Sequence, residues 1–152
     1  MKENIGIKGQ VKIELFDKDH KLKQVISKKN LIVYNGYNFI RQCLSKSASR
    51  PVVANYLSIG SGVTAATRAD TGMESELARK LATYTEAETD TGYKDQWKLD
   101  VMFSGGEGTG TVSESGILND VSGGVLFCRT TFTGIVKAGS DELAFEWTFT
   151  VS

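Results

Sequence analysis

Alternating apolar and polar residues divide most of this chain into short extended segments. Residues 11–15 read Val-Lys-Ile-Glu-Leu, and this period of two is typical of a strand with one buried face. The charged stretch 17–21 then favours a turn into a second strand over 22–27. The N-terminal part of the chain therefore predicts a β-hairpin.

The clearest strand pattern lies at 143–151. Its apolar positions are Leu143, Phe145, Trp147, Phe149 and Val151, and Ala, Glu and Thr stand between them. Each aromatic ring on that face can bury about 150–250 Å². We expect this face to lie in the core, the strand to be paired on at least one side, and the C-terminus to belong to the folded unit.

Further strands are expected in the middle of the chain. Segments 80–88 and 96–103 flank a polar turn and predict a second antiparallel pair. Segments 111–118 and 125–133 predict two more strands around a turn. The Gly-rich stretch 104–110 predicts a mobile loop between the strands at 96–103 and 111–118.

One segment changes from the strand period to the helix period. Its apolar and small residues are Gly36, Tyr37, Ile40, Cys43 and Leu44. This spacing predicts one short helix over 36–45, with Asn35 as the N-cap and residues 45–51 as the stop. A single helical turn is also expected at 73–79.

Length and composition narrow the fold class. The chain has 152 residues, sixteen of them Gly and one Pro. That length suits one domain, which buries roughly 70% of the surface exposed by the unfolded chain. About eight short strands joined by Gly turns predict a mainly β protein, an antiparallel β-sandwich or jelly-roll-like fold. We expect residues 1–152 to form a single domain, with residues 1–8 either a strand or an extended N-terminal arm.

Charge is distributed unevenly although the net charge is zero. Residues 1–50 carry eleven Lys/Arg against four Asp/Glu, and residues 51–152 carry seven against fourteen. If the fold keeps the halves apart, a basic and an acidic surface favour docking between copies or onto an oppositely charged partner. The alternative is that the lysines are solvated on exposed strands and turns. The basic stretch lacks interleaved aromatic residues, so no nucleic acid partner is expected.

Two features report on the cellular compartment. The start, Met1-Lys2-Glu3-Asn4, leads into a strand pattern without an apolar signal region, and no apolar run approaches the ~18 residues of a membrane span. We expect synthesis in the cytoplasm and no membrane partner. Cys43 and Cys128 lie in apolar settings without Cys-x-x-Cys spacing, which favours buried, reduced thiols.

Cofactor motifs are incomplete. Residues 60–65, Gly-Ser-Gly-Val-Thr-Ala, follow a strand as a dinucleotide fingerprint does, but residues 64–72 lack the apolar periodicity of the helix that such a site requires. A turn that ends the strand explains the motif better. The glycines of 104–110 lack the Lys-Ser/Thr of a phosphate-binding loop. We expect no cofactor.

Catalytic and metal-binding signatures are weak as well. His20 is the only histidine and lies in a predicted turn, a poor position for a catalytic base. One histidine and two distant cysteines do not complete a zinc site. The remaining candidates are carboxylate pairs, which are usually solvated at such spacing: Glu74/Glu76, Glu86/Glu88 and Asp141/Glu142. We expect no catalytic residue, no metal and no enzymatic activity.

Three segments carry a family resemblance. The block 56–79 runs from an apolar strand through Gly-x-Gly and a Thr/Ala-rich loop to a Met-Glu-Ser-Glu-Leu-Ala-Arg element. The entry to the helix, residues 29–36, reads Lys-Asn-Leu-Ile-Val-Tyr-Asn-Gly, and strands at 125–133 and 143–151 close the chain. This order resembles small virion structural proteins of tailed bacteriophages.

The resemblance implies a structural role in a virion, with other virion proteins as partners and a homo-oligomeric state. A single short domain fits a capsid decoration (cement) protein that binds and stabilises the assembled head, with loops 61–72 and 104–110 facing the partner. The alternative is a tail, fibre or baseplate accessory protein. In that role, exposed Tyr56, Tyr84 or Tyr93 would contact a glycan.

Overall fold

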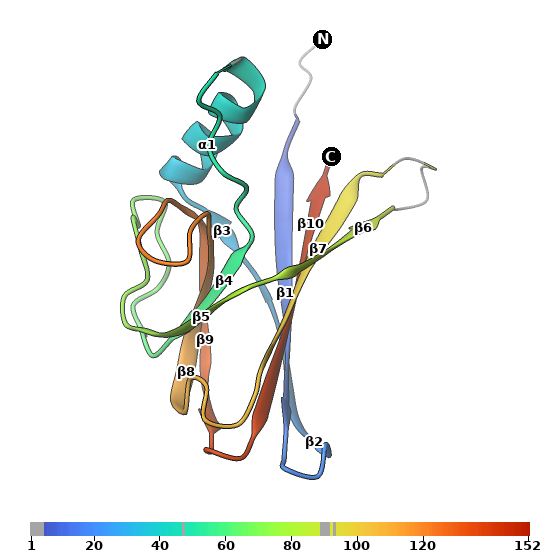
Figure 1. Ribbon diagram of the computed structural model, residues 1–152, viewed down its shortest axis with the longest axis vertical. Coiled ribbons are helices and arrows are strands. Elements are labelled where there is room, and N and C mark those ends of the chain that lie inside the picture. The colour runs from blue at the N-terminus through green and yellow to red at the C-terminus, as the bar shows by residue number, and fades with distance from the viewer. Residues whose placement is uncertain (1–4, 47, 89–91, 93) are drawn as a thin grey trace.

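The structure, a computed structural model that describes residues 5–46, 48–88, 92 and 94–152, is a sandwich of two antiparallel sheets and one helix (Figure 1). Sheet A contains, side by side, β2 (Leu22–Lys29), β1 (Ile7–Phe16), β10 (Glu142–Val151), β7 (Gln96–Phe103) and β6 (Thr83–Ala87). Sheet B contains β3 (Leu31–Ile32), β9 (Leu126–Lys137), β8 (Gly110–Leu118), β4 (Tyr56–Gly60) and β5 (Glu76–Leu81). The helix is α1 (Tyr34–Ser45). The predicted β-sandwich with one short helix is confirmed, with ten strands instead of about eight.

The core lies between the sheets, and β10 runs through the middle of sheet A. Leu143, Phe145, Trp147 and Phe149 are at most 1% exposed, and β10 pairs with β1 on one side and β7 on the other. The ring of Phe149 stacks on that of Trp97 at 4.9 Å. The prediction that the aromatic face of this strand is buried is confirmed.

The segment predicted as one strand over 80–88 belongs to both sheets. It leaves sheet B at the end of β5, turns at Ala82 and continues in sheet A as β6. The backbone N–H of Ala82 donates to the carbonyl of Asn55 at 2.8 Å, which fixes the corner. The polar turn that follows lies partly outside the described residues.

The prediction of a helical turn at 73–79 is wrong, because residues 76–81 form β5 (Glu76–Leu81). A helix this short is marginal, since nucleation costs more than its few hydrogen bonds return. Pairing with β4 provides those hydrogen bonds without a nucleus. Long-range pairing therefore outweighs the local helical pattern.

Helix α1 confirms the predicted helix over 36–45, but it begins two residues earlier. Its N-cap is Val33, which makes no side-chain cap hydrogen bond, so the assignment of Asn35 as N-cap is wrong. The backbone N–H of Tyr34 instead donates to the carbonyl of Arg68 at 2.8 Å. Gly36 is buried, and a side chain there would collide with the backbone of Phe127 in β9.

The cysteines follow the prediction in part. Both are free thiols, Cys128 fully buried and Cys43 only partly buried. Burial raises the pKa of the Cys128 thiol to about 12, so this thiol is protonated at neutral pH.

The two oppositely charged halves of the chain are interleaved. β1, from the basic half, pairs along its whole length with β10, from the acidic half. Lys12 lies opposite Glu146, and Nζ of Lys23 is 3.1 Å from Oδ2 of Asp141. The condition for two separate charged surfaces is therefore not met.

The N-terminal segment is a strand from Ile7 onward. Gly6 extends the pairing, because its N–H and carbonyl form hydrogen bonds of 2.6 and 2.9 Å with the backbone of Ser152. Of the two alternatives for residues 1–8, the strand therefore holds from Ile7 onward, with Gly6 paired beside it. Residues 1–4 lie outside the described part of the chain.

We expect Phe149→Ala to lower the free energy of unfolding by about 3–5 kcal/mol, because it leaves a cavity in the core. The matched control is Thr148→Ala, which changes the opposite face of the same strand and should alter stability by less than about 0.5 kcal/mol. Urea denaturation followed by tryptophan fluorescence measures both. Equal effects of the two substitutions would show that the aromatic face is not the stabilising one.

Candidate functional site

Residues 61–75, which we call the strap, cover the outer face of sheet B. The strap follows the Gly-x-Gly motif and lies on the side of sheet B that faces away from sheet A (Figure 1). Met73 packs there against a small second core of Val33, Leu118 and Leu126. Sheet B is therefore covered on both faces, and β8 is buried along most of its length.

A buried ion pair fastens the strap to the sheet. Glu114 of β8 is fully buried and Arg129 of β9 is 3% exposed, and Nε of Arg129 donates to Oε2 of Glu114 at 2.8 Å. The same carboxylate accepts the backbone N–H groups of Gly62 at 3.1 Å, Glu74 at 3.1 Å and Ser75 at 2.7 Å. Both ends of the strap thus converge on one carboxylate.

The rest of the Arg129 guanidinium binds the strap itself. Nη1 donates to Oδ2 of Asp70 at 2.8 Å, and Nη2 donates to Oε2 of Glu74 and to the carbonyl of Thr64, both at 3.2 Å. Burial pushes the pKa of Asp70 upward, but hydrogen bonds from Thr67 and Arg129 outweigh it and hold that pKa below its usual range. Hydrogen bonds from Thr64, with the nearby Arg129, lower the pKa of Glu74. Both carboxylates are therefore charged at neutral pH.

The Gly-x-Gly motif is explained by this arrangement. A Cβ on Gly62 would lie 2.6 Å from the carboxylate of Glu114, and one on Gly60 would meet the same group and the carbonyl of Ser75. Glycine is required because the backbone approaches the carboxylate so closely. The predicted strand-ending turn is confirmed, since β4 ends at Gly60. The backbone N–H of Gly62 in this motif donates to the Glu114 carboxylate of the same chain.

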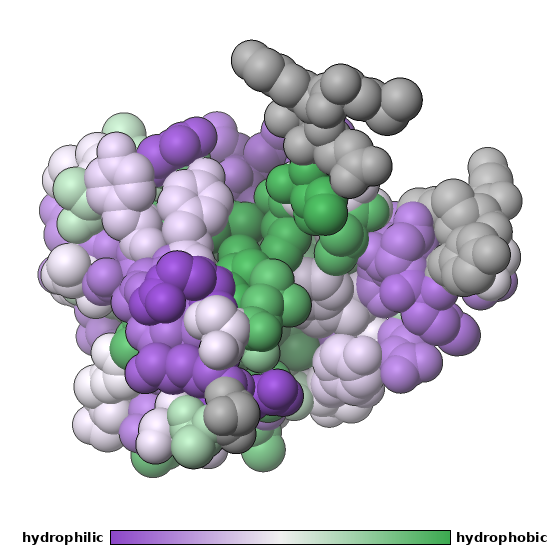
Figure 2. All heavy atoms as spheres, turned by 90° about the horizontal axis from the view of Figure 1, so that it is seen from above, coloured by the Kyte–Doolittle hydropathy of each residue, from purple (hydrophilic) through white to green (hydrophobic). Residues whose placement is uncertain are grey.

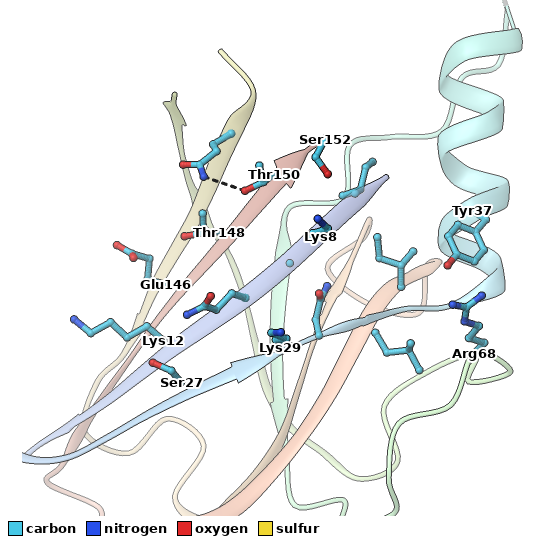
Figure 3. Close-up of a pocket in the computed structure, with 17 residues that line it drawn as sticks. Lys8, Lys12, Ser27, Lys29, Tyr37, Arg68, Glu146, Thr148, Thr150 and Ser152 are labelled. Atoms are coloured by element: carbon cyan, nitrogen blue, oxygen red, sulfur yellow. Dashed lines mark hydrogen bonds between the residues drawn. The ribbon is translucent and has the colours of Figure 1, made fainter. Parts of the chain in front are cut away.

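A cleft of about 770 Å³ opens next to the strap (Figure 3). Polar residues of the outer face of sheet A form one side of it, and the first turn of α1 and Arg68 of the strap form the other. Four basic side chains and one carboxylate line it: Lys8, Lys12, Lys29, Arg68 and Glu146. We call this the basic cleft.

Arg68 connects the strap to the basic cleft. Its guanidinium lies over the ring of Tyr37, 5.6 Å from the centroid, in cation–π geometry. Its carbonyl accepts the N–H of Tyr34 at the start of α1. Because the strap is fixed by Glu114, it holds both Arg68 and the beginning of the helix at the rim of the cleft.

No protein-family model matches this chain, and neither the curated proteins nor the solved structures include a match.

Of the residues considered for catalysis, the structure brings His20 and Glu142 together, on an exposed turn. His20 lies in the hairpin turn between β1 and β2, where its Nδ1 is 2.9 Å from Oε2 of Glu142. Glu74 binds Arg129, and Glu76 binds Arg79 at 2.7 Å. Within the described residues, no group of three or more His, Cys, Asp or Glu is arranged to hold a metal ion. Nor does any described helix have the length and apolar character to cross a membrane.

The second predicted contact loop, 104–110, is tied to its surroundings. Oε2 of Glu107 accepts hydrogen bonds from Nζ of Lys80 at 2.9 Å and from the N–H of Ser104 at 2.8 Å. The N–H of Gly106 donates to the carbonyl of Gly139 at 2.8 Å. The expectation of a loose connection is not met at these positions.

Of the tyrosines considered for glycan contact, Tyr84 is 57% exposed and Tyr56 is half-buried. Tyr93 lies outside the described residues. Tyr84 is thus the one of the two described rings that faces solvent.

Sequence reasoning missed Glu114 and Arg129. The available signal was a charged residue in the middle of each of two predicted strands, 111–118 and 125–133. Buried charges are normally paired, so two such residues of opposite sign on adjacent strands would have indicated the ion pair.

We expect Arg129→Met to lower the free energy of unfolding by about 3–5 kcal/mol, because it leaves the Glu114 carboxylate buried without its partner. Amide hydrogen exchange at Gly62 and Ser75 should accelerate more than exchange in β10. The control is Lys98→Met, which breaks the partly exposed Lys98–Glu146 pair and should cost at most about 1 kcal/mol. Unchanged protection of the strap in Arg129→Met would contradict this role of the pair.

We expect Gly62→Ala to destabilise the protein by about 1–3 kcal/mol, because the new methyl group collides with Glu114. Gly72→Ala is the matched control, since nothing lies within 4 Å of a Cβ there. Thermal unfolding compares the two variants. A neutral Gly62→Ala would rule out close approach to the carboxylate as the reason for this glycine.

Proposed function

We propose that this protein is a structural component of a tailed-bacteriophage virion that binds the assembled head as a decoration protein. The basic cleft is the observation that carries the proposal, because it offers a preformed, positively charged binding surface. The block 56–79, on which the family resemblance rests, is the part of the chain that delivers Arg68 to this cleft.

The cleft suits an acidic protein surface. Four cationic side chains face one carboxylate, and the Lys12 amine is also 3.1 Å from Oε1 of Glu14. The remaining surplus of positive charge steers an acidic partner toward the cleft and weakens as salt screens it. Gln10, Thr148 and Thr150 at the cleft add neutral hydrogen-bonding groups.

Stabilisation of the head follows from mass action. A domain that binds the assembled shell and not its free subunits adds binding free energy to the assembled state alone. The shell gains the most stability when many copies of the protein bind at equivalent positions. This mechanism requires no enzymatic activity and no cofactor.

A second candidate is a tail, fibre or baseplate accessory protein that contacts a glycan, and the exposure of Tyr84 favours it. A glycan site combines an aromatic platform with convergent polar groups. The hollow next to Tyr84 is lined by Phe39, Val53, Trp97 and other apolar residues. That lining suits an apolar side chain better than a sugar.

We expect quantitative mass spectrometry of purified particles to find this chain in hundreds of copies, the number that decoration of a shell implies. A dozen or fewer copies would indicate the tail or a vertex. Absence from particles would overturn the proposal of a virion protein.

The docking surface has its own test. Lys8→Glu together with Lys29→Glu should weaken co-sedimentation with purified heads at least tenfold at low salt, because both substitutions reverse charge in the basic cleft. Lys18→Glu is the control, since Lys18 lies in the exposed turn between β1 and β2. Equal binding by both charge variants would exclude the cleft, and tighter binding to DNA than to heads would favour a nucleic acid partner.

A further inference from the structure

Strand β6 forms an edge of sheet A. Among the residues that the structure describes, it is the terminal strand of that sheet and pairs with β7 alone. Four of its five residues, Thr83–Glu86, are exposed, and Thr83–Ala87 contains no Lys, Arg or Pro. An edge of this kind presents backbone hydrogen-bonding groups to another strand.

The two longer edges elsewhere in the sandwich carry the features that usually prevent strand addition. β2, the opposite edge of sheet A, includes Lys23, Lys28 and Lys29 in eight residues. β5, an edge of sheet B, includes Arg79 and Lys80. Charged side chains on an edge oppose pairing with a second copy. β6 carries a single charged side chain, Glu86, and no Lys or Arg.

An apolar hollow of about 220 Å³ lies beside β6. Its rim includes Val53, 65% exposed, and Tyr84, 57% exposed, and Phe39, Trp97 and Phe127 line its interior. Apolar residues also gather at the end of the sandwich that carries α1, between the helix and sheet A (Figure 2). Exposed apolar surface next to a free edge marks an interaction site.

The sequence of β6 is complementary to itself. In an antiparallel pair of two β6 strands centred on Thr85, Thr85 faces Thr85, Tyr84 faces Glu86 and Thr83 faces Ala87. No like charges are opposed, and Thr–Thr is a favourable cross-strand pair. A pair centred on Glu86 would instead place two carboxylates opposite each other.

We propose that two copies of this chain associate through antiparallel pairing of their β6 strands, which joins two A sheets into one continuous sheet. Tyr84 pairs with Leu99, a core residue 2% exposed, so Tyr84 faces the inner side of the sheet. In the dimer, the Tyr84 side chain of each copy lies beside the apolar hollow of the other copy. This proposal rests on the edge and the hollow alone, and it does not depend on the virion role.

Sedimentation velocity over the micromolar range tests the pairing. We expect the wild-type chain to dimerise and Thr85→Lys and Thr85→Glu each to weaken the dimer at least tenfold, because each places like charges on the two-fold axis. An equimolar mixture of the two variants should restore dimers, since Lys then faces Glu. The control is Ser27→Lys on β2, which should leave the dimer unchanged.

A thiol cross-link tests the register without adding charge. Thr85→Cys should form a disulfide-linked dimer under mild oxidation, whereas Ser27→Cys on the opposite edge should not. A wild-type chain that stays monomeric throughout the range would overturn the proposal. So would a dimer that tolerates Thr85→Lys and gives no Thr85→Cys cross-link.

Discussion

The buried ion pair between Glu114 and Arg129 is the constraint on which the rest of this structure depends. Removing two charges from water costs several kcal/mol for each ion, and the cost is offset only where further hydrogen bonds complete both groups. Here backbone N–H groups at both ends of residues 61–75 complete the carboxylate, and Asp70, Glu74 and a carbonyl complete the guanidinium. The buried ion pair therefore needs the strap to complete its hydrogen bonds, and the strap in turn is held in place by the pair.

Through the strap, this pair shapes surface features at a distance from it. The strap supplies the carbonyl that receives the first N–H of α1, and it holds the guanidinium of Arg68 over Tyr37. Arg68 and Tyr37 line one side of the basic cleft. The geometry of the basic cleft therefore depends on the buried carboxylate of Glu114, and substitutions beneath the strap should alter the cleft.

The sequence predicted those parts of the fold in which one face of a strand is apolar. Residues 11–15, 96–103 and 143–151 are strands because period-two alternation matches a half-buried sheet. Prediction was wrong where long-range pairing decided the outcome: 76–81 pairs with β4, and Ala82 divides one apparent strand between two sheets. The cap of α1 was missed because its hydrogen-bond acceptor comes from Arg68, far along the chain. The basic cleft was not predicted either, because its basic residues lie on separate elements that only the folded chain brings together.

The central position of β10 has a consequence for the order of folding. Strands β1 and β2, and strands β6 and β7, can each pair as soon as they are synthesised, because each pair is close in sequence. The strand that joins the two pairs is made after all of them. Sheet A therefore cannot be completed until β10 is made and inserts between the two ribbons. Such late, non-local closure favours slow folding and exposes the nascent chain to aggregation.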